Sequence, residues 1–280
     1  MFEREVKKSS KVSVITLTNK RDDTLIRAIE SVKNQNYDGE IEHILVNDGN
    51  LFVNSKKSSL LEAYPFLRII DVDISTYKGE FHSLYIPSRI SLLRNIGIDK
   101  CSGYLICQLG DDDYYLPNHI NSLVNTLIAN PDAGVAYSWR YLVHSDGSPC
   151  VEPFYPWSSA YPRLSTSGVA LSKYVYERLV VSGIRDVNSN IVKDMVLTSE
   201  GEPVYTVDTN ELMVRRDVHR LIPFRVKFNW RQMIEDYSED YCFVKECHEF
   251  GILFACSSEA TLVYTIGGFS NNQRLWAEKK

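Results

Sequence analysis

Short apolar segments and longer amphipathic segments alternate along this chain. Residues 11–18, 41–46 and 67–72 are rich in Val and Ile, which predicts three strands. The segment between the first two strands has apolar residues at helical spacing, which predicts a helix. These residues are Leu25, Ala28, Ile29 and Val32. A strand, a helix and a second strand of these lengths form a unit whose strands are parallel, with a right-handed crossover.

The same reading continues to the end of the chain. Helices are predicted over residues 88–100, from Pro117 to Asn130, and from Ser238 to about Glu249, and strands over 104–109, 135–139 and 262–266. Residues 51–66 are polar and carry no predicted element, and residues 145–167 are loop-rich with four prolines. The pattern predicts an α/β fold with a mixed, mainly parallel sheet flanked by helices.

The segment at residues 104–113 carries the strongest chemical signal. Its first six residues form a nearly unbroken apolar run, as in a strand buried on both faces. Asp111, Asp112 and Asp113 follow, after Gly110. Adjacent carboxylates repel one another, so a fold retains them where water or a cation offsets the charge. A solvated acidic turn is the alternative, but ligands of α/β sheets bind beyond the carboxyl ends of strands, and hard oxygen donors suit Mg²⁺ or Mn²⁺.

Composition excludes some classes of protein. The chain has 280 residues, of which 44% are hydrophobic and 24% charged, as expected for a globular protein with a sizeable core. A net charge of −5 gives no general affinity for nucleic acid. No apolar run approaches the ~20 residues of a membrane span, and the charged N-terminus does not resemble a signal peptide. We therefore expect a cytoplasmic protein with no transmembrane segment.

The six cysteines form no C-x-x-C pair and no regular framework, which predicts reduced, mostly buried thiols. Cys242, Cys247 and His248 do not have the spacing of a zinc site, so we interpret them as residues of a helix.

Two later segments allow two interpretations each. Tyr155, Trp157 and Tyr161 lie on the proline-rich loop, where aromatic rings either stack on a sugar or base or cover the core. A basic run spans residues 215–227 and is either a solvated face or a phosphate contact. Its members are Arg215, Arg216, His219, Arg220, Arg225 and Lys227.

The order of the motifs resembles the family 2 glycosyltransferases of the GT-A fold. The similar segments run from residue 11 to residue 268. They are the opening strand and loop at 12–21, Val46-Asn47-Asp48-Gly49-Asn50, Arg94-Asn95-Ile96-Gly97 with Ser102-Gly103-Tyr104-Leu105, the acidic segment 109–117, and Glu239-Asp240-Tyr241. The resemblance implies a single domain, with a nucleotide-sugar-binding half at about 11–140 and an acceptor-binding half at about 141–280.

The chain departs from the family pattern at three positions. Asn19 stands where an aromatic residue usually stacks on the base, Asn47 replaces the first carboxylate of the base-binding turn, and Gly110 occupies the first position of the D-x-D motif. The Q-x-x-R-W motif of processive members is not reproduced at residues 273–276, so we expect the transfer of a single sugar.

The resemblance implies an inverting transfer from a nucleotide-sugar, with a UDP-sugar as the expected donor, to an acceptor hydroxyl. Asp112 and Asp113 are the expected ligands of Mn²⁺ or Mg²⁺, and Asp240 at a helix start is the expected general base. The residues expected to hold the donor are Thr18, Asn19, Arg21, Asp48, Arg94 and Asp111.

Three questions stay open at this point. Glu239 and Asp240 could merely favour the helix N-terminus, an effect of roughly 0.3–1 kcal/mol. A sugar-phosphate nucleotidyltransferase and a non-catalytic nucleotide- or sugar-binding module are the alternative functions, although residues 16–23 lack the glycine-rich loop of the former. The acceptor is undetermined among a glycan, a lipid-linked sugar, a small metabolite, a protein and a modified nucleobase in DNA.

Overall fold

The computed structural model describes residues 5–157, 165–197 and 203–267, with the backbone alone described for residues 165–171. Its strands are β1 (Val12–Thr18), β2 (Ile41–Asn47), β3 (Leu67–Asp71), β4 (Leu105–Gly110), β5 (Tyr114–Tyr115), β6 (Ala133–Val143), β7 (Ile191–Val192), β8 (Leu212–Arg215) and β9 (Leu253–Thr265). Its α-helices are α1 (Asp23–Lys33), α2 (Leu51–Ala63), α3 (Ile86–Lys100), α4 (His119–Ala129), α5 (Ser165–Val181), α6 (Arg216–Leu221), α7 (Trp230–Ile234) and α8 (Glu239–Glu249). Two 3₁₀ turns, η1 (Ile74–Tyr77) and η3 (Thr209–Glu211), are added to these.

One mixed sheet organises the molecule, with the strand order β3-β2-β1-β4-β8-β6-β9-β5 and β7 attached to β6. The first four strands in this order are parallel, as the strand–helix–strand pattern predicts. β8 then pairs antiparallel with both β4 and β6, while β6 and β9 are parallel. The parallel half brings the carboxyl ends of β1, β2 and β4 to one edge, where α/β proteins bind ligands.

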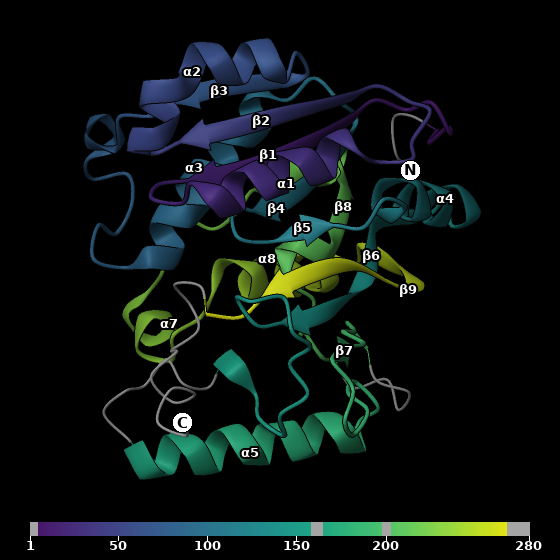
Figure 1. The fold of residues 1–280 in the computed structure, drawn as a ribbon. Helices are drawn as coiled ribbons and strands as arrows, with labels where there is room; N and C mark the ends of the chain where they lie inside the picture. Colours follow the sequence, from purple (N-terminus) through teal and green to yellow (C-terminus); the bar gives the residue numbers. More distant parts are fainter. Residues whose placement is uncertain (1–4, 158–164, 198–202, 268–280) are drawn as a thin grey trace.

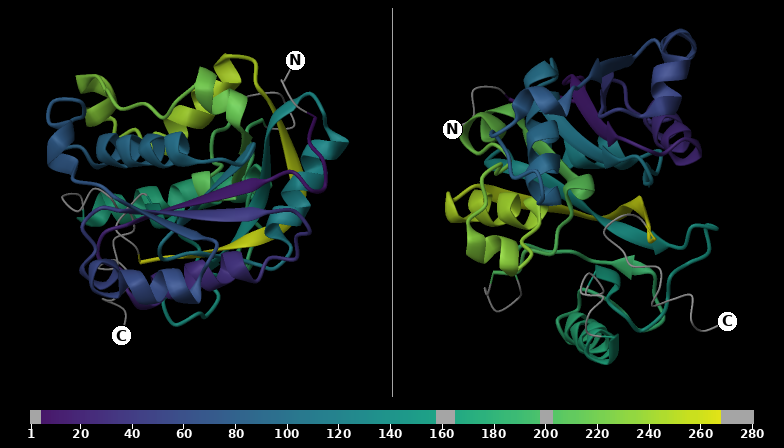
Figure 2. Two further views of the ribbon diagram at one scale, coloured as in Figure 1. Left: turned by 90° about the horizontal axis from the view of Figure 1, so that it is seen from above. Right: turned by 90° about the vertical axis from the view of Figure 1, so that its left-hand side faces the viewer.

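Helices cover both faces of the sheet. Figure 2 shows α1 and α2 on one side and α3 with α8 on the other. Leu25 of α1 and Val53 of α2 pack on Leu45 of β2, while Leu93 of α3 packs against Ile15 and other residues of the opposite face. β4 is buried along Leu105–Leu109 because it lies between these two layers, which confirms the prediction of a strand covered on both faces. α5 lies apart from the sheet, at the bottom of Figure 1.

The structure differs from the sequence prediction at several places, and the short elements β5, β7, β8, α6 and α7 were not predicted. Residues 51–63 form a helix although only Val53 and Leu60 of that helix are buried, so its apolar signal is weak. Asn50 starts this helix by accepting hydrogen bonds from the backbone N–H groups of Phe52 and Val53. The loop-rich segment ends in α5, and β6 and β9 are each longer than expected. Tyr161 and residues 273–276 lie outside the described residues.

All six cysteines are free thiols, five of them buried, which confirms the prediction of unpaired cysteines. Cys242 and Cys247 are core residues of α8, and His248 on the same helix contacts the Tyr205 hydroxyl at 3.1 Å. Among the described residues, no helix has the length and apolar character of a membrane span.

Candidate active site

The three aspartates that follow β4, here called the acid triplet (Asp111, Asp112 and Asp113), have different surroundings. The Thr18 hydroxyl at the end of β1 donates a hydrogen bond to Asp111. Asp112 forms an ion pair with Arg21, with 3.3 Å between Oδ2 and Nη2. These two carboxylates are partly exposed and lie at the edge where β1 and β4 end.

Asp113 is held inside the protein. Its side chain is buried, and its two oxygens accept hydrogen bonds from the Asn210 amide at 2.7 Å and from the Thr265 backbone N–H at 2.8 Å. A ligand therefore reaches Asp111 and Asp112 more readily than Asp113.

Burial raises the pKa of all three aspartates of the triplet. It raises the pKa of Asp111 to about 6, with the neighbouring Asp112 charge as the second cause. The pKa of Asp112 is raised although Arg21 opposes the shift, and that of Asp113 is raised further by the Asp112 charge. The carboxylates are thus short of positive charge, and a divalent cation that prefers oxygen ligands fits Asp111 and Asp112.

Polar side chains connect the ends of β1, β2 and β4. Asn50, fully buried, donates from Nδ2 to the Thr18 hydroxyl oxygen and to the Arg21 carbonyl, both at 2.8 Å. Since the Thr18 hydroxyl donates onward to Asp111, one hydrogen-bonded chain fixes the loop after β1 against the acid triplet. Asn50 was not expected among the site residues, because an Asn after a strand indicates a turn as readily as a functional residue.

Asp48 lies at the other side of this loop. Its carboxylate is 8% exposed and accepts two hydrogen bonds at Oδ2 from Arg89, at 2.9 and 2.6 Å, while its backbone carbonyl accepts from the Asn19 amide. Sequence reasoning missed Arg89, which lies one turn before Arg94 on α3. Both arginines of α3 are thus engaged with acidic partners.

Arg94 bridges β4 and α8. Its guanidinium donates to Gln108 Oε1 at 3.0 Å and pairs with Glu239 at 3.3 Å. Glu239 is 8% exposed, and burial raises its pKa to about 7. The pair fixes the first turn of α8 relative to the central strand.

Asp240 occupies the second position of α8, after the N-cap residue Ser238. Its Oδ1 accepts a hydrogen bond from the Tyr241 backbone N–H at 2.7 Å. Burial is the first cause of its raised pKa and the charge of Asp208 is the second.

Asp208 connects the two acidic parts of the site, and sequence reasoning missed it. Its charge also raises the pKa values of Asp112 and Asp113. β4 and β8 pair antiparallel with Cys107 opposite Met213, so the continued register brings η3 alongside the end of β4. Asp208 therefore lies within electrostatic reach of both the acid triplet and Asp240.

The buried guanidinium of Arg140 holds Asp208 in place. Arg140 on β6 pairs with Asp194 and Asp208 at 3.1 Å each and with Glu211 at 3.8 Å, and we call these four residues the Arg140 cluster. Asp208 is 14% exposed, whereas Asp194 and Glu211 are at most 1% exposed. Asp208 is thus the carboxylate of the cluster that faces the site.

Trp157, on the described part of the proline-rich loop, packs on this cluster together with Tyr264 of β9. The Arg140 guanidinium lies 4.7 Å from the centre of the Trp157 ring and 5.3 Å from that of Tyr264. Tyr155 contacts Trp157 in turn, with 5.1 Å between the ring centres. Trp157 therefore covers a buried charge in this structure.

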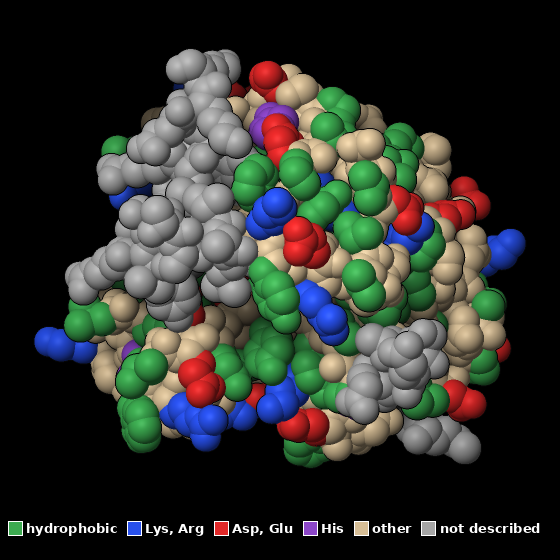
Figure 3. All heavy atoms as spheres, turned by 90° about the horizontal axis from the view of Figure 1, so that it is seen from below, with side chains coloured by type: hydrophobic (Ala, Val, Ile, Leu, Met, Phe, Trp, Pro, Cys, Tyr) green, Lys and Arg blue, Asp and Glu red, His purple; other side chains and the backbone are tan. Residues whose placement is uncertain are grey.

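The basic run is only partly a solvated face, because Arg220 and Lys227 are exposed while Arg215 and His219 are buried. Arg215 is buried and donates to the carbonyls of Pro131 and Ala133, and His219 is buried against Phe243. Arg225 pairs with Glu246 on α8. The face seen in Figure 3 likewise shows Lys and Arg side chains interspersed with Asp and Glu among its described residues.

The predicted GT-A fold is confirmed by comparison with solved structures, which gives the class of fold. No family model matches the sequence. S. aureus TarS 1–349 has a TM-score of 0.57 at 14% identity, over 91% of this chain and 60% of that one. Its complex with UDP has a TM-score of 0.59 at 13% identity, over 96% and 62%, and its complex with UDP-GlcNAc has 0.54 at 13%, over 91% and 58%. The chain thus shares its fold with TarS and spans about 60% of the length of TarS 1–349.

Proposed function

We propose that this protein is an inverting glycosyltransferase that moves one sugar from a UDP-sugar to an acceptor hydroxyl, with Mn²⁺ or Mg²⁺ bound. The supporting observation is that Asn210 joins Asp208 to Asp113 by donating to both carboxylates, and that Asp208 lies within electrostatic reach of Asp112 and Asp240. A reaction of this kind needs a leaving-group side and a base side on opposite faces of the sugar, and these two acidic parts supply them. The fold shared with TarS, whose structures include complexes with UDP and UDP-GlcNAc, is consistent with such a donor.

On the leaving-group side, Asp112 and Asp111 hold the divalent cation. When bound, the cation supplies positive charge that stabilises the departing diphosphate. Asp113, which the sequence suggests as a second ligand, instead orients the turn through Asn210 and Thr265. Arg21 keeps Asp112 in place and provides a guanidinium beside the diphosphate.

The loop after β1 and the turn after β2 hold the nucleoside. Arg89 takes both of its hydrogen bonds at Oδ2 of Asp48, so Oδ1 remains to accept an N–H of the base. Asn19 fixes the Asp48 backbone, which gives it a role other than stacking on the base. Thr18 orients Asp111 from the same loop.

On the base side, Asp240 takes the proton from the acceptor hydroxyl. Burial and the Asp208 charge raise its pKa, which makes its carboxylate a stronger base. The N-terminus of α8 supports its charge through the Tyr241 N–H. We assign Arg94, which the resemblance suggests as a diphosphate contact, a positioning role, because its Nη1 contacts Gln108 and its Nη2 pairs with Glu239.

Between the two sides, Asp208 accepts hydrogen bonds from hydroxyls of the transferred sugar. Arg140 and the Asn210 backbone N–H hold this carboxylate, so it can bind a hydroxyl without moving. The Asn210 amide oxygen is buried and has no hydrogen-bond partner among the described residues, so a second acceptor is available beside it. The carboxylate favours neutral sugars and disfavours uronic acids.

The test is transfer or slow hydrolysis of a panel of UDP-sugars with Mn²⁺, measured as UDP release and by NMR of the anomeric proton of the product. Asp240→Asn should lower turnover about 10²–10⁴-fold while the donor Kd stays within about twofold of the wild-type value. Glu249→Gln, an exposed residue at the other end of α8, is the matched control and should leave turnover unchanged. Release of a nucleoside monophosphate, a retained anomeric configuration, or normal turnover by Asp240→Asn would contradict the proposal.

A further inference from the structure

A second group of metal-ligating side chains lies in the hairpin that follows β6, apart from the acid triplet. The chain reverses after His144, whose backbone N–H bonds to the Ser148 carbonyl at 2.8 Å, and Cys150 then pairs with Leu142 at 3.0 Å. Gly147 permits the reversal, because its φ of 84° lies in the left-handed region. This antiparallel register places His144 and Cys150 on one face, and Glu152 lies in the bend that follows.

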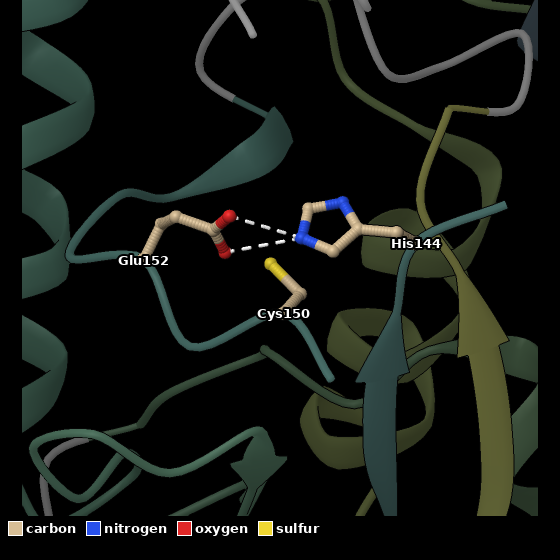
Figure 4. Close-up of side chains that lie close together, drawn as sticks. All are labelled: His144, Cys150 and Glu152. Atoms are coloured by element: carbon tan, nitrogen blue, oxygen red, sulfur yellow. Dashed lines mark hydrogen bonds and ion pairs between the residues drawn. The ribbon is translucent and has the colours of Figure 1, made fainter. Parts of the chain in front are cut away.

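The three side chains converge, as Figure 4 shows. His144 Nε2 lies 3.0 and 3.2 Å from the two carboxylate oxygens of Glu152. One ligand atom from each of the three residues lies within 4.8 Å of the others. Cys150 is 1% exposed, whereas His144 and Glu152 are 28% and 39% exposed. The Cys150 side chain is therefore enclosed by protein, whereas the His144 and Glu152 side chains are accessible to solvent.

We propose that His144, Cys150 and Glu152 form a Zn²⁺ site with water as the fourth ligand. Zn²⁺ is borderline soft and binds sulfur, imidazole nitrogen and carboxylate oxygen in tetrahedral geometry, whereas Mg²⁺ and Mn²⁺ prefer oxygen alone. This donor set therefore separates the site chemically from the acid triplet. The inference does not depend on the proposed function.

Zn²⁺ binding at this site releases a proton. Arg185 holds the backbone of Cys150 by donating to its carbonyl at 2.8 Å. The metal binds the thiolate, so it displaces the thiol proton, and its affinity increases with pH. The bound ion connects the end of β6 to the segment that leads to Trp157.

Co²⁺ is the probe, because thiolate ligation produces a near-ultraviolet charge-transfer band that oxygen ligands do not produce. The metal-free full chain should show this band at one equivalent of Co²⁺, and Zn²⁺ should abolish it by displacement.

Cys150→Ser should remove the band, while Cys256→Ser, at a cysteine outside the hairpin, should retain it. Asp112→Asn should also retain it, which keeps this test separate from that of the active site. Absence of the band in the wild-type protein, or its persistence in Cys150→Ser, would overturn the proposal. If Cys150→Ser does not fold by circular dichroism, the partly exposed Glu152→Gln decides: Zn²⁺ affinity reduced by more than about tenfold supports the site, and unchanged affinity rejects it.

Discussion

The acid triplet and the Arg140 cluster both collect three carboxylates in a largely buried place, but they handle the charge differently. In the Arg140 cluster, one guanidinium pairs with all three carboxylates, and Trp157 and Tyr264 cover it. In the acid triplet, Arg21 pairs with Asp112 from a partly exposed position, and Asp111 relies on a hydroxyl. The cluster contains its own cation, Arg140, whereas the metal site that we propose at the triplet would take its cation from solution.

This difference teaches that carboxylate density alone does not define a metal site. Desolvation raises the pKa of acids in both places, including Asp194 to about 6 and Asp111 to about 6. A site can accept a cation only where carboxylate oxygens are accessible. Asp111 and Asp112 are partly exposed, whereas Asp194 and Glu211 are buried. Asp208 is part of the Arg140 cluster because it pairs with Arg140. Its partly exposed side makes it part of the candidate active site as well.

The largest effect is expected from Asp112→Asn. Loss of this carboxylate should weaken Mn²⁺ binding more than about tenfold and lower turnover about 10²–10³-fold. The Mn²⁺ affinity is measured without substrate, by electron paramagnetic resonance. Asp132→Asn, at an exposed position, is the control. Wild-type Mn²⁺ affinity in Asp112→Asn would show that the triplet is not the metal site.

Arg140→Met tests the Arg140 cluster. It leaves three buried carboxylates without their cation and should lower the free energy of unfolding by about 3–5 kcal/mol, measured in urea. Arg231→Ala removes an exposed ion pair with Glu235 and should leave the free energy of unfolding close to the wild-type value. A comparably small loss for Arg140→Met would mean that Arg140 does not stabilise the cluster.

Gly110→Ala should perturb the triplet from within. A Cβ at this position would lie 3.0 Å from Asp113 Oδ2, 3.2 Å from Asp112 Oδ1 and 3.4 Å from Asn210 Nδ2. The crowding should lower the free energy of unfolding by about 1–3 kcal/mol and weaken Mn²⁺ binding several-fold. Unchanged values for both quantities would show that the neighbouring side chains move aside freely, and that glycine is not required here.

The smallest effect concerns pH. The pKa of Asp111 is raised in the folded state to about 6, so its contribution to stability is present at low pH and is lost as pH rises through about 6. Metal-free Asp111→Asn should therefore be more stable than the wild type at pH 7 by on the order of 1 kcal/mol and nearly equal to it at pH 4. The folded-state pKa of Asp194 is raised as well, so it makes stability depend on pH with the same sign. This contribution is unchanged in Asp111→Asn.

The Mn²⁺ response runs in the opposite direction. Because the cation binds the ionised carboxylate, the increase in Tm that Mn²⁺ causes should shrink as pH falls from 7 to 5. Thermal scans with and without Mn²⁺ measure this. An Mn²⁺ effect that is equal at both pH values would contradict the assignment of Asp111 to the metal site.

Local pattern was enough to predict most of the parallel half of the fold. Apolar residues at a spacing of two or 3.6 identify β1, α1, β2 and α3 because each element buries one face or both against neighbours near in sequence. α2 escaped detection because Leu51, at its start, is 81% exposed and few of its other positions are buried, so its helical period is faint. The acid triplet could be recognised from the sequence as a candidate site, because three adjacent aspartates after a buried strand are costly without a ligand.

The sequence by itself determined the α/β class, the order of the first strands and the position of the acidic turn, since these follow from periodicity and local charge. Only the tertiary structure decided that Asp113 is held by Asn210, that Arg94 pairs with Glu239, and that Asp208 lies within electrostatic reach of both the triplet and Asp240. The reason is physical: partners such as Arg140 and Asp208 are far apart along the chain, and no local pattern records which buried charge meets which. Desolvation makes such pairings energetically decisive, and it exists only after the chain has folded.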